Sequence, residues 1–520
     1  MKLTIQNTFS EELPADPIEE NTRRQVRNAC FSYVNPKKTS NPKILHVSKE
    51  MMQELGLSER DVQSDKFLKI MTGNEVLDNT RPYAMHYGGH QFGNWAGQLG
   101  DGRAINLAEI VHNSKRWAIQ LKGAGETPYS RSADGLAVLR SSIREYLCSE
   151  AMYHLQVPTT RALSLAITGD MVLRDIMYNG NAAYEKGAIV CRVAPSFIRF
   201  GNFEILAAYG DHNNLKLLTD YTIKHFFPEI KNTGKDAYVS LLSEVSKRSL
   251  KMVIDWQRVG FVHGVMNTDN MSILGLTIDY GPYGWLEGFD TGWTPNTTDR
   301  QFKRYRYGTQ PEIVLWNLYQ LANALYPLIE EVDPLEKVLE DYQNSYKIEY
   351  IDMMFSKIGV FSKSKKDHLF IKDFEELLQL TETDMTIFFR NLANYKKGFP
   401  EKGLQTVKEA FYSPDDLKDH LLERWNVWFA KYDDRLKEEL MTDEERKKKM
   451  NTVNPKYVLR NYMAQLAIDE ADEGNYKLID ELYQLLKKPY DDQPEHQKWF
   501  AKRPEWARNK VGCSMLSCSS

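Results

Sequence analysis

Three polar side chains near the middle of the chain have the types and spacing of a metal and phosphate site. Asp269 and Asn270 are adjacent, and Asp279 follows a largely apolar run, Met-Ser-Ile-Leu-Gly-Leu-Thr-Ile, that is broken by one glycine. Two short strands joined by a tight turn would place Asn270 and Asp279 side by side. Oxygen ligands of this kind hold Mg2+ on nucleotide phosphates. We therefore predict that residues 261–281 form a magnesium and nucleotide site.

The same stretch also matches most of a kinase catalytic loop. If His263 begins the H-R-D-x-x-x-x-N pattern, Asn270 takes the place of the metal-binding Asn, and Asp279-Tyr280-Gly281 stands in for D-F-G. The position of the usual catalytic Asp is Val265, which cannot accept a proton from a hydroxyl group. Either the chain is an inactive kinase, or another carboxylate does this chemistry, and Asp269 is the candidate.

The elements that must position these residues follow the order of a kinase. Residues 87–103 are rich in glycine, and they lead into two segments with strand patterns, 104–110 and 117–123, the second containing Lys122. Residues 137–156 are predicted to form a helix with Glu145 in its middle. In kinases a strand Lys contacts phosphates and is oriented by a helix Glu. Taken singly, Lys122 and Glu145 could also be a solvated strand end and an exposed helix residue.

Further phosphate ligands are predicted before and after this helix in the sequence. Glycines remove the Cβ that would keep backbone amides away from phosphate, so Gly97-Gln-Leu-Gly-Asp-Gly-Arg103 is one candidate, although such runs are also ordinary turns. Arg103, Arg192 and Arg199 offer planar guanidinium groups suited to phosphate oxygens, with surface ion pairs as the alternative.

Segments 161–168 and 188–194 have strand patterns. Helical periodicity dominates after residue 204, notably in 312–346 and 475–488.

Composition excludes several classes of protein. The chain has 520 residues, 42% hydrophobic and 27% charged, with a net charge of -4, so we expect a globular protein that does not bind nucleic acid. We expect no membrane partner, because no apolar run approaches the roughly 18 residues of a membrane span. The N-terminus has no signal or transit pattern, and the cytoplasm is the expected location.

The cysteines fall into two groups. Cys30, Cys148 and Cys191 are expected to be small buried side chains. Cys513 and Cys518 lie in a Ser- and Cys-rich tail, which predicts a mobile segment with exposed, reactive thiols or else an idle terminus. His86 and His90 have a spacing seen in zinc sites, but glycines at 88 and 89 argue against a helix there, and we reject zinc.

Together these blocks resemble the selenoprotein O family (SelO, also called YdiU), a pseudokinase-like family of protein adenylyltransferases. Two matching blocks are long and specific: Tyr-Gly-Gly-His-Gln-Phe-Gly, which begins at Tyr87, and Leu-Lys-Gly-Ala-Gly-Glu-Thr-Pro-Tyr-Ser-Arg, which begins at Leu121. The resemblance covers most of the chain, including segments 87–109, 120–150, 192–204 and 260–290, Leu13-Pro14, Arg24-Gln25-Val26 and the extreme C-terminus.

The resemblance implies a role for each site residue. Members of the family bind ATP in a flipped orientation, so that the α-phosphate meets the acceptor hydroxyl and pyrophosphate leaves. On this chain, Asp269 would accept the proton, and Asn270 and Asp279 would bind Mg2+, with Mn2+ as a possible substitute. The implied nucleotide site comprises Gly100, Gly102, Arg103, Lys122 supported by Glu145, Asp134, Gly135, Arg192, Arg199 and Asp279.

The resemblance extends to the tail. Eukaryotic members carry selenocysteine third from the end, where this chain has Cys518. Some bacterial relatives pair a C-terminal Cys with one in the loop after the metal-binding Asp, and Pro295 stands at that place here. Cys518 could instead pair with Cys513 or with a redox partner protein.

We therefore predict an α+β, protein-kinase-like two-lobed fold. Its parts would be an N-terminal extension (1–80), an N-lobe (81–203), a helical C-lobe (204–490) that contains the 261–281 loop, and a tail (491–520) with Cys513 and Cys518. The predicted function is Mg2+-dependent transfer of AMP from ATP to Ser, Thr or Tyr hydroxyls of protein substrates. UMP transfer from UTP, γ-phosphoryl transfer and a non-catalytic ATP-binding scaffold are the alternatives, and a redox protein acting through the tail is a further one.

Overall fold

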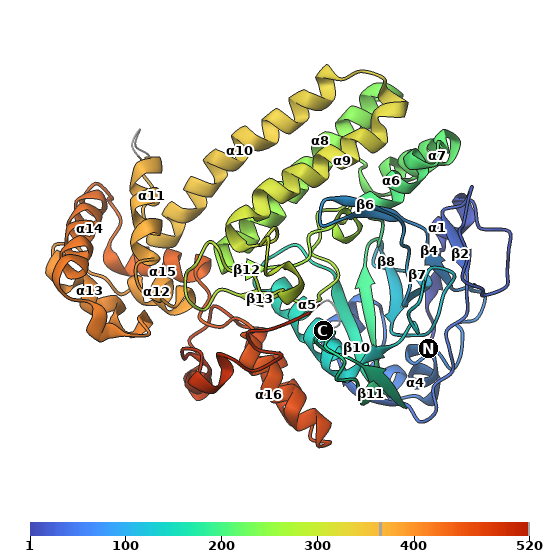
Figure 1. Cartoon of the computed structure of the whole chain (residues 1–520), viewed down its shortest axis with the longest axis horizontal. Helices are drawn as coiled ribbons and strands as arrows, with labels where there is room; N and C mark the ends of the chain where they lie inside the picture. Colours follow the sequence, from blue (N-terminus) through green and yellow to red (C-terminus); the bar gives the residue numbers. More distant parts are fainter. Residues whose placement is uncertain (363–366, 518–520) are drawn as a thin grey trace.

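The computed structural model describes residues 1–362 and 367–517 of the chain. It has an α+β architecture in which a large antiparallel sheet occupies one side and long helices extend away from it (Figure 1). The predicted α+β class is confirmed. The shape follows from the sequence pattern, because the segments with strand patterns lie before residue 195 and most of the helical segments lie after it.

The main sheet runs in the order β2, β4, β7, β8, β11, β10, β3. These strands span Phe31–Tyr33 (β2), Tyr83–Met85 (β4), Ala104–His112 (β7), Lys115–Lys122 (β8), Ala183–Ala194 (β11), Arg161–Arg174 (β10) and Lys43–Val47 (β3). The short strands β1 (Thr4–Ile5) and β9 (Ala137–Val138) pair with β7 and β11. A separate hairpin joins β5 (Gly88–Gln91) and β6 (Asn94–Gln98). The four strands predicted within 104–194 are confirmed, and β10 and β11 extend beyond the predicted bounds.

Residues 1–80 belong to the same sheet as the segment that follows them. Strands β1, β2 and β3 pair with β7, β4 and β10 respectively. Between β3 and β4 lie three short helices that begin after Ser48, Ser58 and Ser64, each of which accepts a hydrogen bond from a backbone N–H of the first turn. The helices of this region are α1 (Thr8–Glu12), α2 (Lys49–Glu54), α3 (Glu59–Val62) and α4 (Asp65–Met71).

Helix α5 (Leu139–His154) carries Glu145 and packs against β10 and β11. The predicted helix at 137–156 is confirmed except at its ends. Ala137 and Val138 form strand β9, and Val138 keeps an extended backbone as the residue that precedes the helix. Ile143, Tyr146 and Leu147 are buried in the main core, so this helix fixes the position of Glu145 beneath the sheet.

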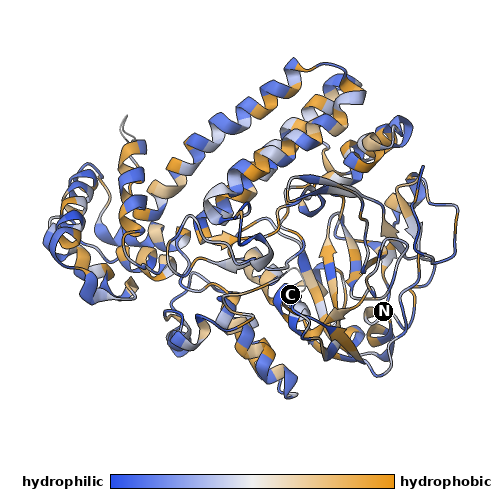
Figure 2. Cartoon of the chain, viewed as in Figure 1, coloured by the Kyte–Doolittle hydropathy of each residue, from blue (hydrophilic) through white to orange (hydrophobic). Residues whose placement is uncertain are grey.

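Helices dominate the chain from residue 200 onward (Figure 1). The predicted helical segment 312–346 contains parts of two helices, because Glu330 adopts a left-handed backbone conformation that ends the first. The segment 475–488 is confirmed as a helix. Hydrophobic and hydrophilic residues alternate along α8, α9 and α10, as expected of helices with one buried side (Figure 2). The α-helices are α6 (Phe200–Ala208), α7 (His212–Phe226), α8 (Lys235–Val259), α9 (Gln310–Ile329), α10 (Asp333–Ile358), α11 (Asp367–Leu378), α12 (Met385–Leu392), α13 (Gly403–Val407), α14 (Asp419–Lys437), α15 (Asp443–Val453), α16 (Asn461–Asp472) and α17 (Lys477–Leu486).

Several short 3-10 helices connect these elements. The three nearest the predicted site are η1 (Thr268–Asn270), η2 (Thr297–Asp299) and η3 (Tyr307–Thr309). The others are η4 (Pro400–Lys402), η5 (Lys408–Ala410), η6 (Pro414–Asp416), η7 (Pro494–Trp499) and η8 (Glu505–Ala507).

The predicted pair of strands between Asn270 and Asp279 is wrong. Strand β12 (Phe261–Val262) pairs instead with β13 (Gly284–Trp285), while Ser272 and Thr277 form single bridges to Arg199 and Thr159. The predicted turn is present at Gly275, whose φ is +66°. The apolar residues of this run are buried in the main core, so their hydrophobicity reflects burial of a loop rather than pairing of strands: Met271, Ile273, Leu274 and Ile278.

Within residues 1–362 and 367–517, no helix combines the length and the apolar composition needed to cross a lipid bilayer.

Candidate nucleotide-binding and transfer site

A cavity of about 830 Å³ lies between the sheet and the 261–281 loop. Its volume falls in the range typical of pockets for small ligands. The structure brings together at this cavity every predicted nucleotide, metal and proton-acceptor residue: Gly100, Gly102, Arg103, Lys122, Asp134, Gly135, Arg192, Arg199, Asp269, Asn270 and Asp279. Glu145 lies behind Lys122.

Lys122 and Glu145 form a buried ion pair. Lys122 Nζ lies 2.6 Å from Glu145 Oε2, and Arg192 Nη1 lies 3.2 Å from Glu145 Oε1. Burial lowers the pKa of Lys122 to about 7, against the opposing effect of Glu145. Burial alone would raise the pKa of Glu145, but Lys122 and Arg192 hold it below its ordinary value. The carboxylate is therefore ionised and fixes both cations at the cavity wall.

Asp279 is held by two arginines. Arg192 Nη1 lies 2.7 Å from its Oδ1, and Arg199 Nη1 donates to its Oδ2. Both guanidinium groups are almost fully buried, whereas the Asp279 side chain is 19% exposed at the cavity. The φ of Asp279 is +61°, a left-handed conformation that few residues other than glycine adopt. Such backbone strain is common at functional sites.

Asp269 and Asn270 lie in helix η1 at the edge of the cavity. Asp269 Oδ2 accepts a hydrogen bond of 3.3 Å from Gln91 Nε2, and its buried Oδ1 has no partner among the described residues. Burial raises the pKa of Asp269 to about 6, although Arg199 acts in the opposite direction. Asn270 Nδ2 donates to the carbonyl oxygen of Val265, so its Oδ1 remains as the acceptor atom.

His263 joins the two ends of this loop. Its Nε2 lies 2.8 Å from the carbonyl oxygen of Ile278, and the N–H of Val265 donates to its Nδ1 at 3.4 Å. Burial lowers the pKa of His263 to about 4, so the ring is neutral, with Nε2 as the donor. His263 thus ties Asp279, which follows Ile278, to the loop that carries Asn270. Val265 lines the cavity and offers no proton acceptor.

The two glycine-containing loops are shaped by close contacts. Gly100 has a φ of +75°, and a Cβ on it would lie 2.3 Å from the ring of Tyr129. Gly135 has a φ of +70°, and a Cβ on it would lie 2.2 Å from the backbone carbonyl of Gly125. Neither position accommodates a side chain. Asp134 forms an ion pair with Arg174 at 2.7 Å, so its carboxylate is already neutralised at the cavity rim.

Three residues with a direct place in this site were missed by the sequence analysis. Asp101 is fully buried between the two predicted glycines, and burial raises its pKa. Gln120 accepts from Arg192, and Gln91 donates to Asp269. Gln91 lies in the Tyr-Gly-Gly-His-Gln-Phe-Gly block, which is distinctive in the sequence but does not indicate a role for Gln91. Asp101 and Gln120 carried no signal beyond their proximity to Gly100 and Lys122 in sequence.

The prediction of an exposed, mobile tail is wrong for Cys513. Its side chain is 4% exposed, and burial raises the pKa of its thiol to about 11. The carbonyl oxygen of Leu516 accepts hydrogen bonds from the N–H and the hydroxyl of Thr297, so the tail is paired with the loop that follows Asp279. The small residues of the tail allow this close packing. Cys518 lies outside the described residues.

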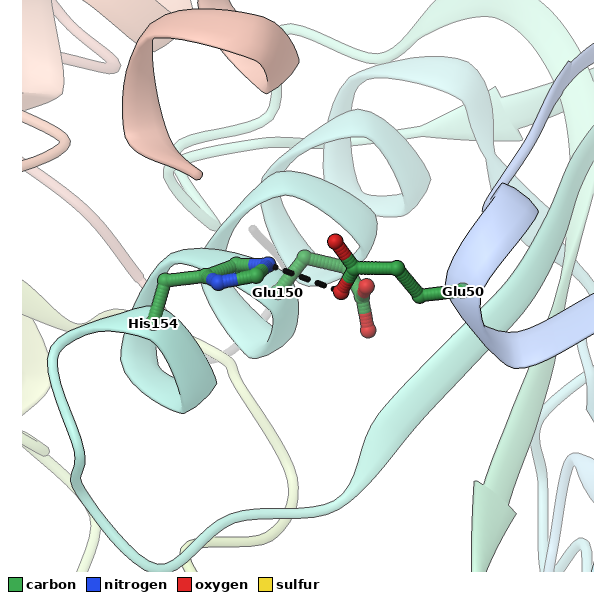
Figure 3. Close-up of side chains that lie close together, drawn as sticks. All are labelled: Glu50, Glu150 and His154. Atoms are coloured by element: carbon green, nitrogen blue, oxygen red, sulfur yellow. Dashed lines mark ion pairs between the residues drawn. The ribbon is translucent and has the colours of Figure 1, made fainter. Parts of the chain in front are cut away.

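A second group of potential metal ligands lies outside the cavity, on helices α2 and α5. Glu50, Glu150 and His154 point toward one another from α2 and α5 (Figure 3). Glu150 accepts two hydrogen bonds from Arg161, at 2.7 and 2.8 Å, and Glu50 lies 2.9 Å from Lys487 Nζ. Because both carboxylates already have cationic partners, we explain this group as a salt-bridge network that joins α2 and α5 to the start of β10 and to the residue after α17, not as a metal centre.

The chemistry available at the cavity is phosphoryl or nucleotidyl transfer. Buried cations, Lys122, Arg192 and Arg199, can stabilise negative charge on phosphate oxygens. Asp279 and Asn270 supply oxygen atoms of the kind that Mg2+ prefers. Asp269 supplies a carboxylate whose raised pKa suits proton acceptance near neutral pH.

Comparison with known proteins agrees with this chemistry. A family model described as protein adenylyltransferase SelO matches residues 19–487. Proteins named protein nucleotidyltransferase YdiU are similar over the whole chain. That of Flavobacterium johnsoniae is 61% identical over 519 residues, 100% of this chain and 99% of the relative. Those of Rhodopirellula baltica and Aromatoleum aromaticum are each 52% identical, again covering 100% of this chain and 99% of the relative.

Proposed function

Because the chain belongs to the SelO family of protein adenylyltransferases, we propose that it transfers AMP from ATP to side-chain hydroxyls of proteins, with Asp269 as the proton acceptor. One observation carries this assignment. The carboxylate of Asp269 lines the same cavity as Lys122 and Asp279, whereas Val265, at the place of the usual kinase base, has none.

Substrate binding would rest on the buried cations. The Lys122, Arg192 and Arg199 side chains line the cavity and are themselves almost fully buried, and charge interactions are stronger for buried groups than for exposed ones. ATP phosphates would draw Arg192 and Arg199 away from Asp279. Glu145 would stay as the counter-charge that keeps Lys122 in place.

The donor set fits a hard divalent cation. Asn270 offers Oδ1, since its Nδ2 is occupied by Val265, and Asp279 offers a carboxylate at the cavity surface. Mg2+ is commonly bound by one or two protein oxygens together with substrate phosphates. When bound, the ion would neutralise charge on the phosphates. Mn2+ has similar ligand preferences and is the alternative.

The transfer step follows from these positions. The acceptor hydroxyl gives its proton to Asp269 as its oxygen forms a bond to the α-phosphorus of ATP. The bond between the α-phosphorus and the oxygen that bridges to the β-phosphorus breaks, and pyrophosphate leaves with the bonding electrons. Lys122, Arg192 and Arg199 would stabilise the charge on the departing group.

The architecture supports a kinase-like division into two lobes. We assign residues 81–203, with α5 and the strands of the main sheet from β4 to β11, to the N-lobe, and residues 204–490 to the helical C-lobe. Lys122 on β8 forms an ion pair with Glu145 on α5, as the strand Lys and the helix Glu do in kinases. His263 contacts the residue before Asp279, which links the two ends of the 261–281 loop. A redox partner acting through Cys518 stays a prediction.

The experiment that tests the proposed function compares two labels. Purified protein is incubated with Mg2+, a mixture of cellular proteins and ATP labelled at the α or the γ position, with α-labelled UTP in parallel. Label on protein from α-labelled ATP alone supports AMP transfer. Stronger labelling from UTP would replace it with UMP transfer, and labelling from γ would make the chain a kinase. Tight ATP binding without any labelling would favour a scaffold.

A further inference from the structure

Four basic residues follow one another closely in the loop after Asp279. Arg300, Lys303, Arg304 and Arg306, which we call the basic segment, lie between helices η2 and η3. Arg300 and Lys303 are exposed, and the other two are half-buried. In the part of the chain that the structure describes, none of the four lies within salt-bridge distance of a carboxylate. Asp299 beside them is buried, and its oxygens accept from the backbone N–H groups of Arg304 and Tyr305.

The basic segment is attached to the loop that carries Asp269. The buried hydroxyl of Tyr305 donates to Asn267 Oδ1 at 2.6 Å, two residues before Asp269. The same hydroxyl accepts from the N–H of Phe92 at 3.0 Å. Tyr305 therefore joins three parts of the structure: the basic segment, the Asp269 loop and the turn between β5 and β6.

The hairpin β5–β6 brings the basic segment to the Asp269 end of the cavity. Gln91 and Phe92 line the cavity beside Asp269. The Arg304 guanidinium lies 3.4 Å from the position that a Cβ on Gly93 would occupy, and 4.7 Å from the ring centre of Trp316. Residues 86–98 contain no Asp, Glu, Lys or Arg, so the hairpin itself places no such charged side chain between the basic segment and the cavity.

The segment also offers apolar contact area. Phe302 is 79% exposed between Arg300 and Lys303, and Trp95 on the hairpin is 40% exposed. Exposed aromatic rings next to cations are typical of surfaces that bind peptides. The whole chain has a net charge of -4, so this positive surface is local and does not suit a large polyanion such as nucleic acid.

We propose that the basic segment recognises the protein acceptor, and that this acceptor carries Asp or Glu residues next to the modified hydroxyl. The inference rests on the proposed function, because it assigns the substrate class of the same site. Opposite charges on the two surfaces would raise the rate of encounter and fix the register in which the hydroxyl meets Asp269.

The test measures acceptor preference with defined peptides. Each peptide has one central Tyr, Ser or Thr in an Ala-Gly sequence, flanked by Asp, by Asn or by Lys, and each is incubated with Mg2+ and α-labelled ATP. We expect kcat/KM for the Asp-flanked peptide to exceed that of its Asn-flanked counterpart by about tenfold at low salt. High salt should reduce this ratio, because exposed charges are screened.

Charge reversal then locates the preference. In the double variant Arg300→Glu/Lys303→Glu the Asp-to-Asn ratio should fall to about one or below. The milder Arg300→Gln/Lys303→Gln should give an intermediate ratio, and it keeps the test valid if the double reversal impairs folding. Lys347→Glu/Lys477→Glu is the matched control, since it changes net charge equally at two exposed positions on α10 and α17 and should keep the wild-type ratio.

The outcomes separate this inference from the proposed function. Absence of α-label on every peptide and on the protein itself would contradict AMP transfer. Equal labelling of Asp- and Asn-flanked peptides, or a ratio that the control variant lowers as much as the double reversal, would overturn the inference alone. The inference would also be overturned if the double reversal lost binding to anionic lipid vesicles or RNA while its Asp-to-Asn peptide ratio stayed at the wild-type value. The segment would then serve a different partner.

Discussion

Asp279 and Arg192 face each other at the cavity wall, with the guanidinium Nη1 2.7 Å from the carboxylate Oδ1. Arg199 contacts the other carboxylate oxygen. The residue we assign to metal binding is thus neutralised by the residues we assign to phosphate binding. The charge of Asp279 is thus balanced by Arg192 and Arg199, and we expect ligand binding to exchange these two ion pairs for contacts with phosphate and metal.

Replacing Asp279 should therefore destabilise the ligand-free protein. In Asp279→Asn the two buried guanidinium groups lose their shared counter-charge, and we expect a loss of about 3 kcal/mol in the free energy of unfolding. Denaturant unfolding without Mg2+ and ATP measures it. Asp341→Asn, which breaks an exposed ion pair with Lys337, is the control and should cost less than about 1 kcal/mol. Equal stability of Asp279→Asn and wild type would contradict the role of this pairing.

Gln91 should act on the proton acceptor and not on the nucleotide. In Gln91→Ala the Asp269 carboxylate loses its donor, and we expect kcat to fall by about tenfold with KM for ATP within about twofold. Steady-state kinetics of AMP transfer measures both. Asn94→Ala, an exposed change on the same hairpin, should leave them unaltered. A raised KM for ATP with unchanged kcat would instead place Gln91 in nucleotide binding.

Lys122 should make ATP binding dependent on pH. Because its pKa is lowered to about 7, the amine is mostly neutral in the free protein above that pH, whereas bound phosphates favour the ammonium form. ATP affinity should fall as pH rises above 7, and binding at pH 8.5 should take up a proton. Calorimetry with a non-hydrolysable ATP analogue in two buffers of different ionisation enthalpy measures this uptake.

The same shift affects stability with a defined sign. A lysine with a lowered folded pKa binds its proton more weakly in the folded than in the unfolded chain, so its contribution to stability is least favourable below pH 7 and improves as pH rises from 7 to about 10.4. Lys122→Met should show neither the proton uptake nor this contribution. Proton uptake that persists in Lys122→Met would assign it to another group.

The native thiols of the described residues should be unreactive. Cys30, Cys148, Cys191 and Cys513 are buried, and burial raises the pKa of each thiol. In Cys518→Ser, a thiol reagent at pH 8 should react slowly with the folded protein and label four cysteines only after unfolding. Rapid labelling of one thiol in native Cys518→Ser would show that the tail opens at Cys513.

The sequence predicted the parts of the site that depend on local patterns. Alternation in β8 and the helical spacing of α5 placed Lys122 and Glu145 correctly on neighbouring elements, and the order of motifs placed Asp279 near them. The pairing of Asp279 with Arg192 and Arg199 could not be predicted, because it depends on side chains 80 and 87 residues away in the chain. Burial of Asp101 has the same origin.

Two predictions were wrong because the composition of a segment did not indicate how that segment is buried. The apolar run after Asn270 suggested paired strands, but Ile273 and Ile278 are buried as part of a loop. The small polar residues of the tail suggested mobility, yet Leu516 pairs with Thr297. Local sequence did not show that these segments contact distant parts of the chain. The pairing of β1, β2 and β3 with the main sheet was hidden for the same reason.

The central claim is that Asp269 accepts the proton that Val265 cannot. The most direct measurement is single-turnover transfer from α-labelled ATP by Asp269→Asn, together with ATP affinity in the presence of Mg2+. We predict that Asp269→Asn binds ATP with wild-type affinity within about threefold and loses AMP transfer by at least about 100-fold. Transfer at a rate near that of wild type would contradict the claim.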